Sequence, residues 1–358
     1  MPPLSPGNRI ALLTSGGDAP GMNAALRGAA RVGVTLGLQV LGVEEGYVGL
    51  LEGRLRPLDV HEVDDAARRG GTVLGSARSK VFPTKEGQRK AREALATHDV
   101  RALVVIGGNG SLAGARTLAN VVAVAGLPAS IDNDLACTSM AIGVDTALNT
   151  IVEACDRISD TASAHRRTFF VEVMGRECGY LAMTAAVASG ADVVLVPEAG
   201  RDDAAIVEAV ARAMEVAYAR DSRKRRVLVV KAEGVKIDAG ALKSRVDARI
   251  GSSLPDVDTR VTVLGHVVRG GAPTAFDRLL GARLANAAVR ALAEGERSFM
   301  AGWSGPGVTR PPSKHDPYVV LTPLDDVLAE TERLMRGESE IARWRRRIVE
   351  EIEPILTR

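Results

Sequence analysis

Short apolar runs alternate along this chain with longer segments in which apolar residues recur at helical spacing. Apolar runs bounded by glycine or polar residues are typical of strands buried in a parallel sheet. We predict such strands at residues 9–13, 39–43, 102–106, 121–127, 168–173, 193–196, 227–230 and 260–264. Amphipathic segments between them predict helices at 85–97, 145–161, 203–219 and 276–293. This alternation favours an α/β fold with mostly parallel, doubly wound sheets and right-handed crossovers.

Two segments depart from this alternation. Residues 236–258 are polar and irregular, which indicates a surface excursion between two strands. Residues 324–356 have a charged face and predict a C-terminal helix. We expect its arginine cluster, residues 345–347, to be a solvated helix face rather than a nucleic-acid patch.

The bulk composition narrows the class of protein. A chain of 358 residues suits two domains better than one, and 46% hydrophobic with 25% charged residues is typical of a globular protein. The net charge of +2 argues against nucleic-acid or membrane partners. Three cysteines without a C-x-x-C pair indicate neither a disulfide framework nor a zinc site. Since no signal peptide or membrane-length apolar run is visible, we expect a cytoplasmic protein.

Glycine-rich turns follow two predicted strands and lead into helices. They are Thr14–Asn23 and Gly107–Ser111. Glycines let backbone N–H groups approach an anion, and the following helix N-terminus adds partial positive charge. Each turn alone could be an ordinary strand–helix connection, but a polyphosphate held between them explains both. A third glycine-rich loop, residues 69–78, ends in Arg78, which suits either bidentate phosphate contact or a solvated surface turn.

Two carboxylates lie close together in the turn after the predicted strand at 121–127. The turn is Pro128–Asp134, and it carries Ser130, Asp132 and Asp134. Ligands bind at the carboxyl ends of strands in open α/β sheets. One acid there can accept a proton while the other orients it or the substrate. A polar turn without chemistry is the alternative, since Asx residues are favoured in turns.

Five segments carry a resemblance to a known family. They are TSGGDAPGMN at 14–23, GSAR at 75–78, IDND at 131–134, VEVMGR at 171–176 and VLGHVVRGG at 263–271. In these motifs the chain resembles the bacterial-type, ATP-dependent 6-phosphofructokinases. The motifs have the same order and spacing as in that family, from about residue 9 to residue 323. The resemblance implies two Rossmann-like three-layer domains with the active site in the cleft between them. It places a nucleotide-binding domain at 1–144 plus about 267–323, and a sugar-phosphate-binding domain at 145–266 plus the C-terminal helix 324–358.

The resemblance implies a glycolytic kinase that phosphorylates fructose 6-phosphate with ATP. Asp132 would be the general base for the sugar's 1-hydroxyl, and the other catalytic residues would be Arg176, Arg78 and Gly16. Residues implied to bind the sugar phosphate are Ser130, Asp134, Arg167, Met174, Gly175, Glu233, Arg260, His266 and Arg269. Arg167 and Arg260 would reach it from a neighbouring subunit, which implies a homotetramer or homodimer. The family more often has Thr in place of Ser130.

The nucleotide site is implied in the same way. It would be lined by Gly16, Tyr47, Arg78, Gly108, Asn109, Gly110, Ser111 and Gly114. On local grounds, Tyr47 lies in a predicted loop and is either a nucleobase contact or a rim aromatic. The implied cofactor is Mg2+, but Asn109 stands where the family has an aspartate that helps to hold it. We therefore predict weakened magnesium binding and a working but slower or more magnesium-demanding enzyme.

Other positions bear on the phosphoryl donor and on regulation by an effector. Pyrophosphate users in the family carry larger residues at the positions of Gly110 and Ala129, so the small residues here favour ATP. Arg27 and Arg31 match effector-binding arginines, although two further positions where relatives carry arginine are Val60 and Ser159. We therefore predict weak or altered allostery, with two solvated helix residues as the alternative.

Two rival functions remain open on the sequence. One is a pyrophosphate-dependent or other sugar-phosphate kinase, for example one acting on sedoheptulose 7-phosphate. The other is a non-catalytic regulatory family member, which Asn109 would favour and which Asp132, Arg176 and Arg78 disfavour.

Overall fold

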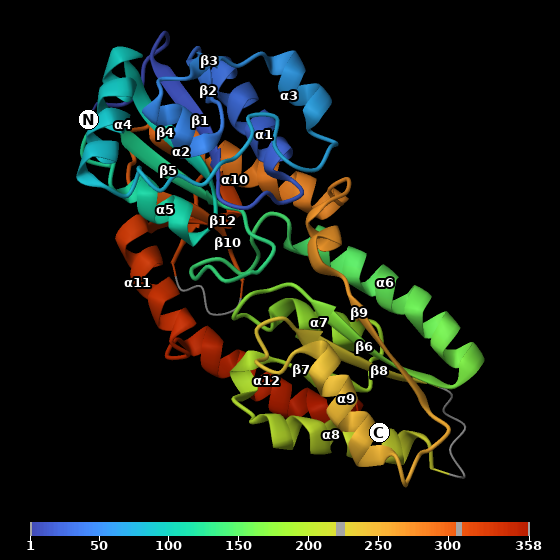
Figure 1. The fold of residues 1–358 in the computed structure, drawn as a ribbon. Helices are drawn as coiled ribbons and strands as arrows, with labels where there is room; N and C mark the ends of the chain where they lie inside the picture. The colour runs from blue at the N-terminus through green and yellow to red at the C-terminus, as the bar shows by residue number, and fades with distance from the viewer. Residues whose placement is uncertain (1, 220–225, 306–309, 357–358) are drawn as a thin grey trace. The chain divides into compact units, whose positions relative to one another are not determined.

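A computed structural model describes residues 2–219, 226–305 and 310–356. The chain forms two compact units (Figure 1), the first from residues 1–146 and 269–336 and the second from 147–268 and 337–358. Residues 1, 220–225, 306–309 and 357–358, which the predicted domain ranges include, lie outside the described residues.

The first unit is built on an eight-stranded mixed sheet in the order β11-β12-β10-β5-β4-β1-β2-β3. The pairs β1–β2, β1–β4, β4–β5 and β5–β10 are parallel, and antiparallel strands β3, β12 and β11 complete the two edges. The apolar runs form the strands because helices cover both faces of the sheet. The strands are β1 (Arg9–Ser15), β2 (Gln39–Val43), β3 (Leu55–Pro57), β4 (Val100–Gly107), β5 (Ala123–Pro128), β10 (Phe299–Trp303), β11 (Pro312–Ser313) and β12 (Asp316–Pro323).

Helix packing in the first unit depends on small residues. A Cβ atom on Gly28 of α1 would lie 3.0 Å from the Cα of Ala282 and the Cβ of Ala285 in α10, so the two helix backbones approach closely there. The helices are α1 (Met22–Thr35), α2 (Gly46–Leu51), α3 (Val60–Ala66), α4 (Lys85–Thr97), α5 (Asn109–Arg116), α10 (Ala275–Ala293) and α11 (Leu324–Met335).

The second unit is built on a fully parallel four-stranded sheet in the order β7-β8-β6-β9. Its strands are β6 (Arg167–Val173), β7 (Val193–Leu195), β8 (Val227–Ala232) and β9 (Asp258–Val263). Helix α6 (Val144–His165) begins in the first unit and continues into the second. The other helices are α7 (Tyr180–Ala188), the short η1 (Pro197–Ala199), α8 (Asp203–Ala217), α9 (Ala239–Ile250), η2 (Gly265–Arg269), which crosses the boundary between the units, and α12 (Glu340–Leu356).

The predicted α/β class with mostly parallel sheets is confirmed, but two segment predictions are wrong. Residues 236–258 are not an irregular excursion, because they contain α9, which buries Leu242, Val246 and Ile250 and is capped by Asp238. The C-terminal segment is two helices, since Gly337 adopts a φ of 75° and the Ser339 hydroxyl accepts the Ala342 N–H. The first of these helices, α11, belongs to the first unit and not to the second.

The arginine cluster on α12 is solvated only in part. Arg346 and Arg347 are exposed, but Arg345 is buried. Its guanidinium lies 2.9 Å from the Cys178 sulfur and 5.3 Å from the centre of the Tyr180 ring. Within the second unit, Arg345 therefore packs α12 against the start of α7. Among the described residues, none of the helices combines the length and apolar character that crossing a bilayer demands.

The start of α6 is held by a buried carboxylate from α10. Asp277 is fully buried and accepts the N–H groups of Gly143 and Thr146 and the Thr146 hydroxyl, at 2.6–2.8 Å. Its own N–H donates to the Thr274 hydroxyl, which caps α10. Burial raises the pKa of Asp277, while these hydrogen bonds oppose that shift. One side chain thus satisfies donors at the N-terminus of the helix that leads into the second unit.

We expect Asp277→Ala to lower the free energy of unfolding of the first unit by about 2–4 kcal/mol, because it leaves three buried donors without their acceptor. Urea unfolding would measure the loss. Arg157→Ala, at an exposed ion pair on α6, is the control and should change the free energy by less than about 0.5 kcal/mol. Equal effects of the two substitutions would contradict this role of Asp277.

Candidate phosphate-binding and catalytic site

Three neighbouring strands of the first unit end at the same level. In the parallel register, Ser15 at the end of β1 pairs with Gly107 at the end of β4, and Gly107 pairs with Pro128 at the end of β5. The two glycine-rich turns and the Asp132 turn therefore leave the sheet side by side. The sequence placed each turn after a strand, and the strand order brings all three to one edge.

The two glycine-rich turns are in close contact. A Cβ atom on Gly107 would lie 2.4 Å from the Ser15 carbonyl oxygen and 2.7 Å from the Ser111 hydroxyl. Gly16 has a φ of 92°, and a Cβ atom there would also approach Ser111 at 3.2 Å. The backbone conformation and the close approach of neighbouring atoms exclude side chains at Gly16 and Gly107. This edge of the sheet therefore presents backbone groups at both positions.

The loop at 69–78 is tied to the first turn by polar side chains that the sequence analysis did not single out. The buried Asn23 donates to the carbonyls of Arg69 and Gly70 and accepts the N–H of Val73. The Thr14 hydroxyl donates to the Gly75 carbonyl, and the Ser76 hydroxyl donates to the Gly16 carbonyl at 2.6 Å. Arg78 is exposed at the end of this loop.

The Asp132 turn is ordered by its own hydroxyl. The Ser130 Oγ atom donates to Asp134 Oδ1 at 3.1 Å and accepts the Asp132 N–H at 3.3 Å. Asp132 is buried, and its Oδ1 atom lies 3.9 Å from Nη2 of Arg269, whose Nη1 donates to the Asp18 carbonyl. The structure therefore brings Ser130, Asp132, Asp134 and Arg269 together beside the first glycine-rich turn.

Two residues expected at the nucleotide site, Tyr47 and Gly114, pack together in this structure. Tyr47 lies in α2 rather than in a loop, is buried, and stacks on Phe82 at 3.9 Å, so it is not a rim aromatic. Its hydroxyl donates to the Ser111 carbonyl, and burial raises its pKa. Gly114 makes room for these rings, because a Cβ atom there would lie 2.9 Å from both. Tyr47 thus contacts the backbone of Ser111 in the second glycine-rich turn, and the nucleotide-binding role of Tyr47 and Gly114 stays a prediction.

The position expected to hold magnesium lies at the start of α5. Asn109 is half-buried, and its Nδ2 atom lies 3.9 Å from the Met335 sulfur. The described part of the chain has no group of three or more His, Cys, Asp or Glu residues that could hold a metal. A protein that offers one neutral carbonyl oxygen suits Mg2+ only when phosphate oxygens and water supply the other ligands.

The second unit repeats the arrangement of adjacent strand ends. Residues 174–176 follow β6, and residues 233–236 follow its neighbour β8. Glu233 Oε1 accepts the N–H groups of Gly175 and Arg176, at 3.0 and 2.7 Å. Gly175 and Arg176 have positive φ values of 147° and 50°, and the Glu233 carboxylate holds the N–H groups of both residues. The Arg176 residue is exposed beside the half-buried Met174.

Three further residues implied to bind the sugar phosphate also lie in the second unit. Arg167 Nε and Arg260 Nη2 both bind Oδ2 of Asp258, at 2.7 and 2.9 Å. The two arginines expected to act together are thus already joined by one carboxylate. His266 is exposed in η2.

The two candidate effector arginines share a carboxylate in the same way. The Nε atoms of Arg27 and Arg31 lie 2.7 and 2.8 Å from Asp64 Oδ1, and Arg31 Nη2 also binds Oδ2. The hydrogen bond from Arg31 holds the pKa of Asp64 at about 2, and Arg27 acts in the same direction. Arg27 and Arg31 are therefore not merely solvated, and an anionic effector would have to compete with Asp64.

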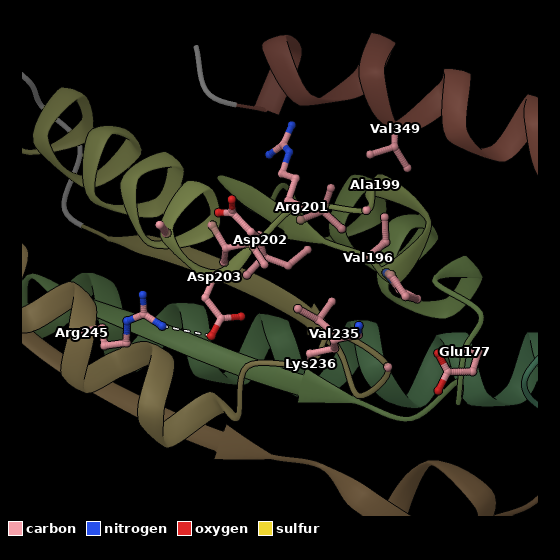
Figure 2. A pocket seen from close by; sticks show the side chains of 17 residues that line it. Glu177, Val196, Ala199, Arg201, Asp202, Asp203, Val235, Lys236, Arg245 and Val349 are labelled. Carbon is pink, nitrogen blue, oxygen red and sulfur yellow. Dashed lines mark hydrogen bonds and ion pairs between the residues drawn. The ribbon is translucent and has the colours of Figure 1, made fainter.

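A separate cavity of about 770 Å³ lies wholly in the second unit (Figure 2). Val196 and Val235 come from the turns after β7 and β8, and Val349 comes from α12. Three of its six charged lining residues are in ion pairs, since Arg245 binds Asp203 and Arg201 binds Glu353. The cavity contains none of the residues predicted to bind substrate.

The fold and this geometry define an α/β protein that presents two glycine-rich turns and a carboxylate pair at one sheet edge. The phosphofructokinase family model matches residues 9–292. The ATP-dependent 6-phosphofructokinase of Natranaerobius thermophilus is 45% identical over 82% of this chain and 89% of its own length. That of Thermotoga neapolitana is 43% identical over 85% and 92%.

A solved phosphofructokinase from Saccharomyces cerevisiae superposes with a TM-score of 0.82 at 32% identity. The match covers 98% of this chain, which spans about half (48%) of the yeast chain. The protein described here belongs to the phosphofructokinase family, as the sequence motifs predicted.

The Asp64 contacts generate a prediction about anion binding. Because the folded pKa is lowered, the stabilisation from this carboxylate is present above the ordinary carboxyl pKa near 4 and is lost as the pH falls through about 2. Asp64 therefore stays charged at neutral pH. The family resemblance implies phosphoenolpyruvate or ADP as the effector at these arginines. We expect wild-type protein to bind phosphoenolpyruvate weakly and Asp64→Asn to bind it roughly tenfold more tightly, because two guanidinium groups lose their partner.

Calorimetric titration would measure this affinity. Asp65→Asn removes the same charge from the next residue, which is exposed, and is the matched control. Strong binding by the wild-type protein, or an equal gain in both variants, would contradict the competition.

Proposed function

We propose that this chain transfers the γ-phosphoryl group of ATP to the 1-hydroxyl of fructose 6-phosphate, with Asp132 as the general base. The observation that carries the proposal is the meeting of two glycine-rich turns with the Asp132 turn at one edge of the first sheet. The names of the relatives support the donor and the acceptor.

In the proposed reaction, Asp132 accepts the proton of the sugar hydroxyl. The hydroxyl oxygen then bonds to the γ-phosphorus, and the bond from that phosphorus to the β–γ bridging oxygen breaks to release ADP. The Ser130 hydroxyl orients the turn, and Asp134 holds the sugar beside Asp132. Arg269, whose Nη2 atom lies 3.9 Å from Asp132 Oδ1, would bind the sugar phosphate.

Positive groups would stabilise the charge on the transferring phosphoryl group. Arg78, at the end of the loop that Asn23 secures, is one of them, and backbone N–H groups around Gly16 and Gly108 are others. Arg176 has the same implied role. Met174, Gly175, Glu233, His266, Arg167 and Arg260 keep their implied contacts with the sugar phosphate as part of the proposal.

Mg2+ bound with the nucleotide would neutralise phosphate charge during transfer. Asn109 would hold it through a neutral oxygen, and the phosphates would supply most of the binding. Gly110 supports ATP as donor, because a Cβ atom there would meet nothing within 4 Å. Neither packing nor a left-handed backbone therefore requires glycine at this position. The absence of a side chain is consistent with space kept for a ligand.

The same proposal includes a homo-oligomer and a cytoplasmic location. It also assigns nucleotide binding to the first unit and sugar-phosphate binding to the second. They rest on the family resemblance.

The direct test is formation of fructose 1,6-bisphosphate by purified protein, with ATP or pyrophosphate as donor and with sedoheptulose 7-phosphate as an alternative acceptor. We expect ATP and fructose 6-phosphate to give the highest kcat/KM. Asp132→Ala should lower kcat by about 10²–10⁴-fold, because the base is lost. Turnover that does not depend on Asp132 would overturn the mechanism. A higher rate with pyrophosphate would overturn the donor, and no turnover at all would favour the regulatory alternative.

Asn109→Asp tests the metal prediction. It adds a carboxylate where a neutral amide stands, so we expect the Mg2+ concentration needed for half-maximal rate to fall several-fold. Steady-state rates across a magnesium titration would measure it, with Asn120→Asp, on a segment beyond α5, as a charge-matched control. If kcat and magnesium dependence are both unchanged, Asn109 does not weaken the metal site.

A further inference from the structure

Asn133 lies between Asp132 and Asp134, the two acids of the Asp132 turn. Asn133 is 1% exposed, and its side chain is directed into the protein. Its Nδ2 atom donates to the Ser139 carbonyl at 3.2 Å, and its Oδ1 atom accepts the Ala141 N–H at 3.1 Å. Both ends of the carboxamide are therefore used on the segment that follows the turn.

That segment is itself fixed to the sheet. The Ser139 N–H donates to the Trp303 carbonyl at the end of β10, and Ile142 forms an isolated parallel bridge with Ala129. The Ile142 N–H donates to the Pro128 carbonyl at 2.9 Å, and the Ser130 N–H donates to the Ile142 carbonyl at 3.2 Å. Asn133 thus connects the acid-bearing turn to a frame attached to two strands.

The backbone at Asn133 is also unusual. Its φ is 51°, in the left-handed region that asparagine tolerates better than most side chains. Glycine would adopt this conformation but has no carboxamide. Aspartate would also adopt it and accept the Ala141 N–H, but its second oxygen would face the Ser139 carbonyl oxygen. Asparagine alone combines the backbone conformation with a donor and an acceptor of the right length.

We propose that Asn133 is a positioning residue for phosphoryl transfer. Its carboxamide and left-handed backbone together fix the direction of Asp132 and keep Asp134 beside it, without contact with substrate. The inference rests on the proposed role of Asp132 as the base. A displacement of about 1 Å at a reacting group lowers rates by roughly 10²-fold, so loosening this turn should lower kcat more than it lowers binding.

Two variants separate the contributions of the backbone and the side chain. Asn133→Gly keeps the left-handed conformation and loses both hydrogen bonds, whereas Asn133→Asp keeps the acceptor and loses the donor. Ser139→Ala is the matched control, because it removes the hydroxyl that contacts the Trp303 and Ser304 carbonyls but leaves the backbone carbonyl that Asn133 binds. For each variant, kcat, KM for both substrates, the Kd of fructose 6-phosphate and the thermal midpoint would be measured.

We expect both Asn133 variants to lower kcat by roughly 10²-fold, with the Kd of fructose 6-phosphate changed by less than about threefold. Ser139→Ala should keep kcat within about twofold of wild type, although its thermal midpoint falls by an amount similar to that of the Asn133 variants. If the Asn133 variants match Ser139→Ala in kcat while Asp132→Ala is inactive, the positioning role is wrong and the proposed base stands. If Asp132→Ala keeps wild-type turnover, the proposed function itself fails. If Asn133→Gly does not fold, a wild-type kcat in Asn133→Asp still overturns the inference.

Discussion

Parallel pairing of β1, β4 and β5 is the constraint on which the proposed chemistry depends. The last residues of the three strands pair with one another, so the turns that follow begin at the same level of the sheet. Parallel strands present all their carboxyl ends on one side, and each turn there precedes a helix or a functional loop. The apolar strands that bury the core thus also determine where backbone N–H groups and Asp132 meet.

Buried polar side chains then give these turns their shapes. Asn23 holds the loop that ends in Arg78, and Asn133 holds the turn that carries Asp132. In the second unit the exposed Glu233 accepts the N–H groups of Gly175 and Arg176. Asn23 and Asn133, which are not proposed to touch substrate, thus satisfy backbone groups of the segments that carry Arg78 and Asp132. A buried polar network that is fully hydrogen-bonded specifies one arrangement of the chain, which is what transfer between two bound substrates requires.

The strands and the motif-bearing turns were predictable because each depends on the types of residues that are adjacent in the sequence. Continuous apolar runs mark buried parallel strands, and glycines mark the turns after them. Asn23, Tyr47 and Arg345 were not predictable in the same way, because their partners lie far along the chain, in loop 69–78, Phe82 and Cys178. Helix α9 was missed because its buried face consists of only four apolar residues within a mostly polar segment. The pairing of Arg27 and Arg31 with Asp64 likewise joins two helices that no local pattern connects.

We propose that Asp132 acts on the reacting hydroxyl and not in sugar binding. A single-turnover measurement on Asp132→Asn, combined with calorimetric binding of fructose 6-phosphate, separates these two roles, because the substitution removes the base and keeps the shape of the side chain. We expect a Kd within about threefold of wild type and a transfer rate lowered by at least about 10²-fold. An unchanged transfer rate, or a loss of rate fully explained by lost sugar binding, would contradict it.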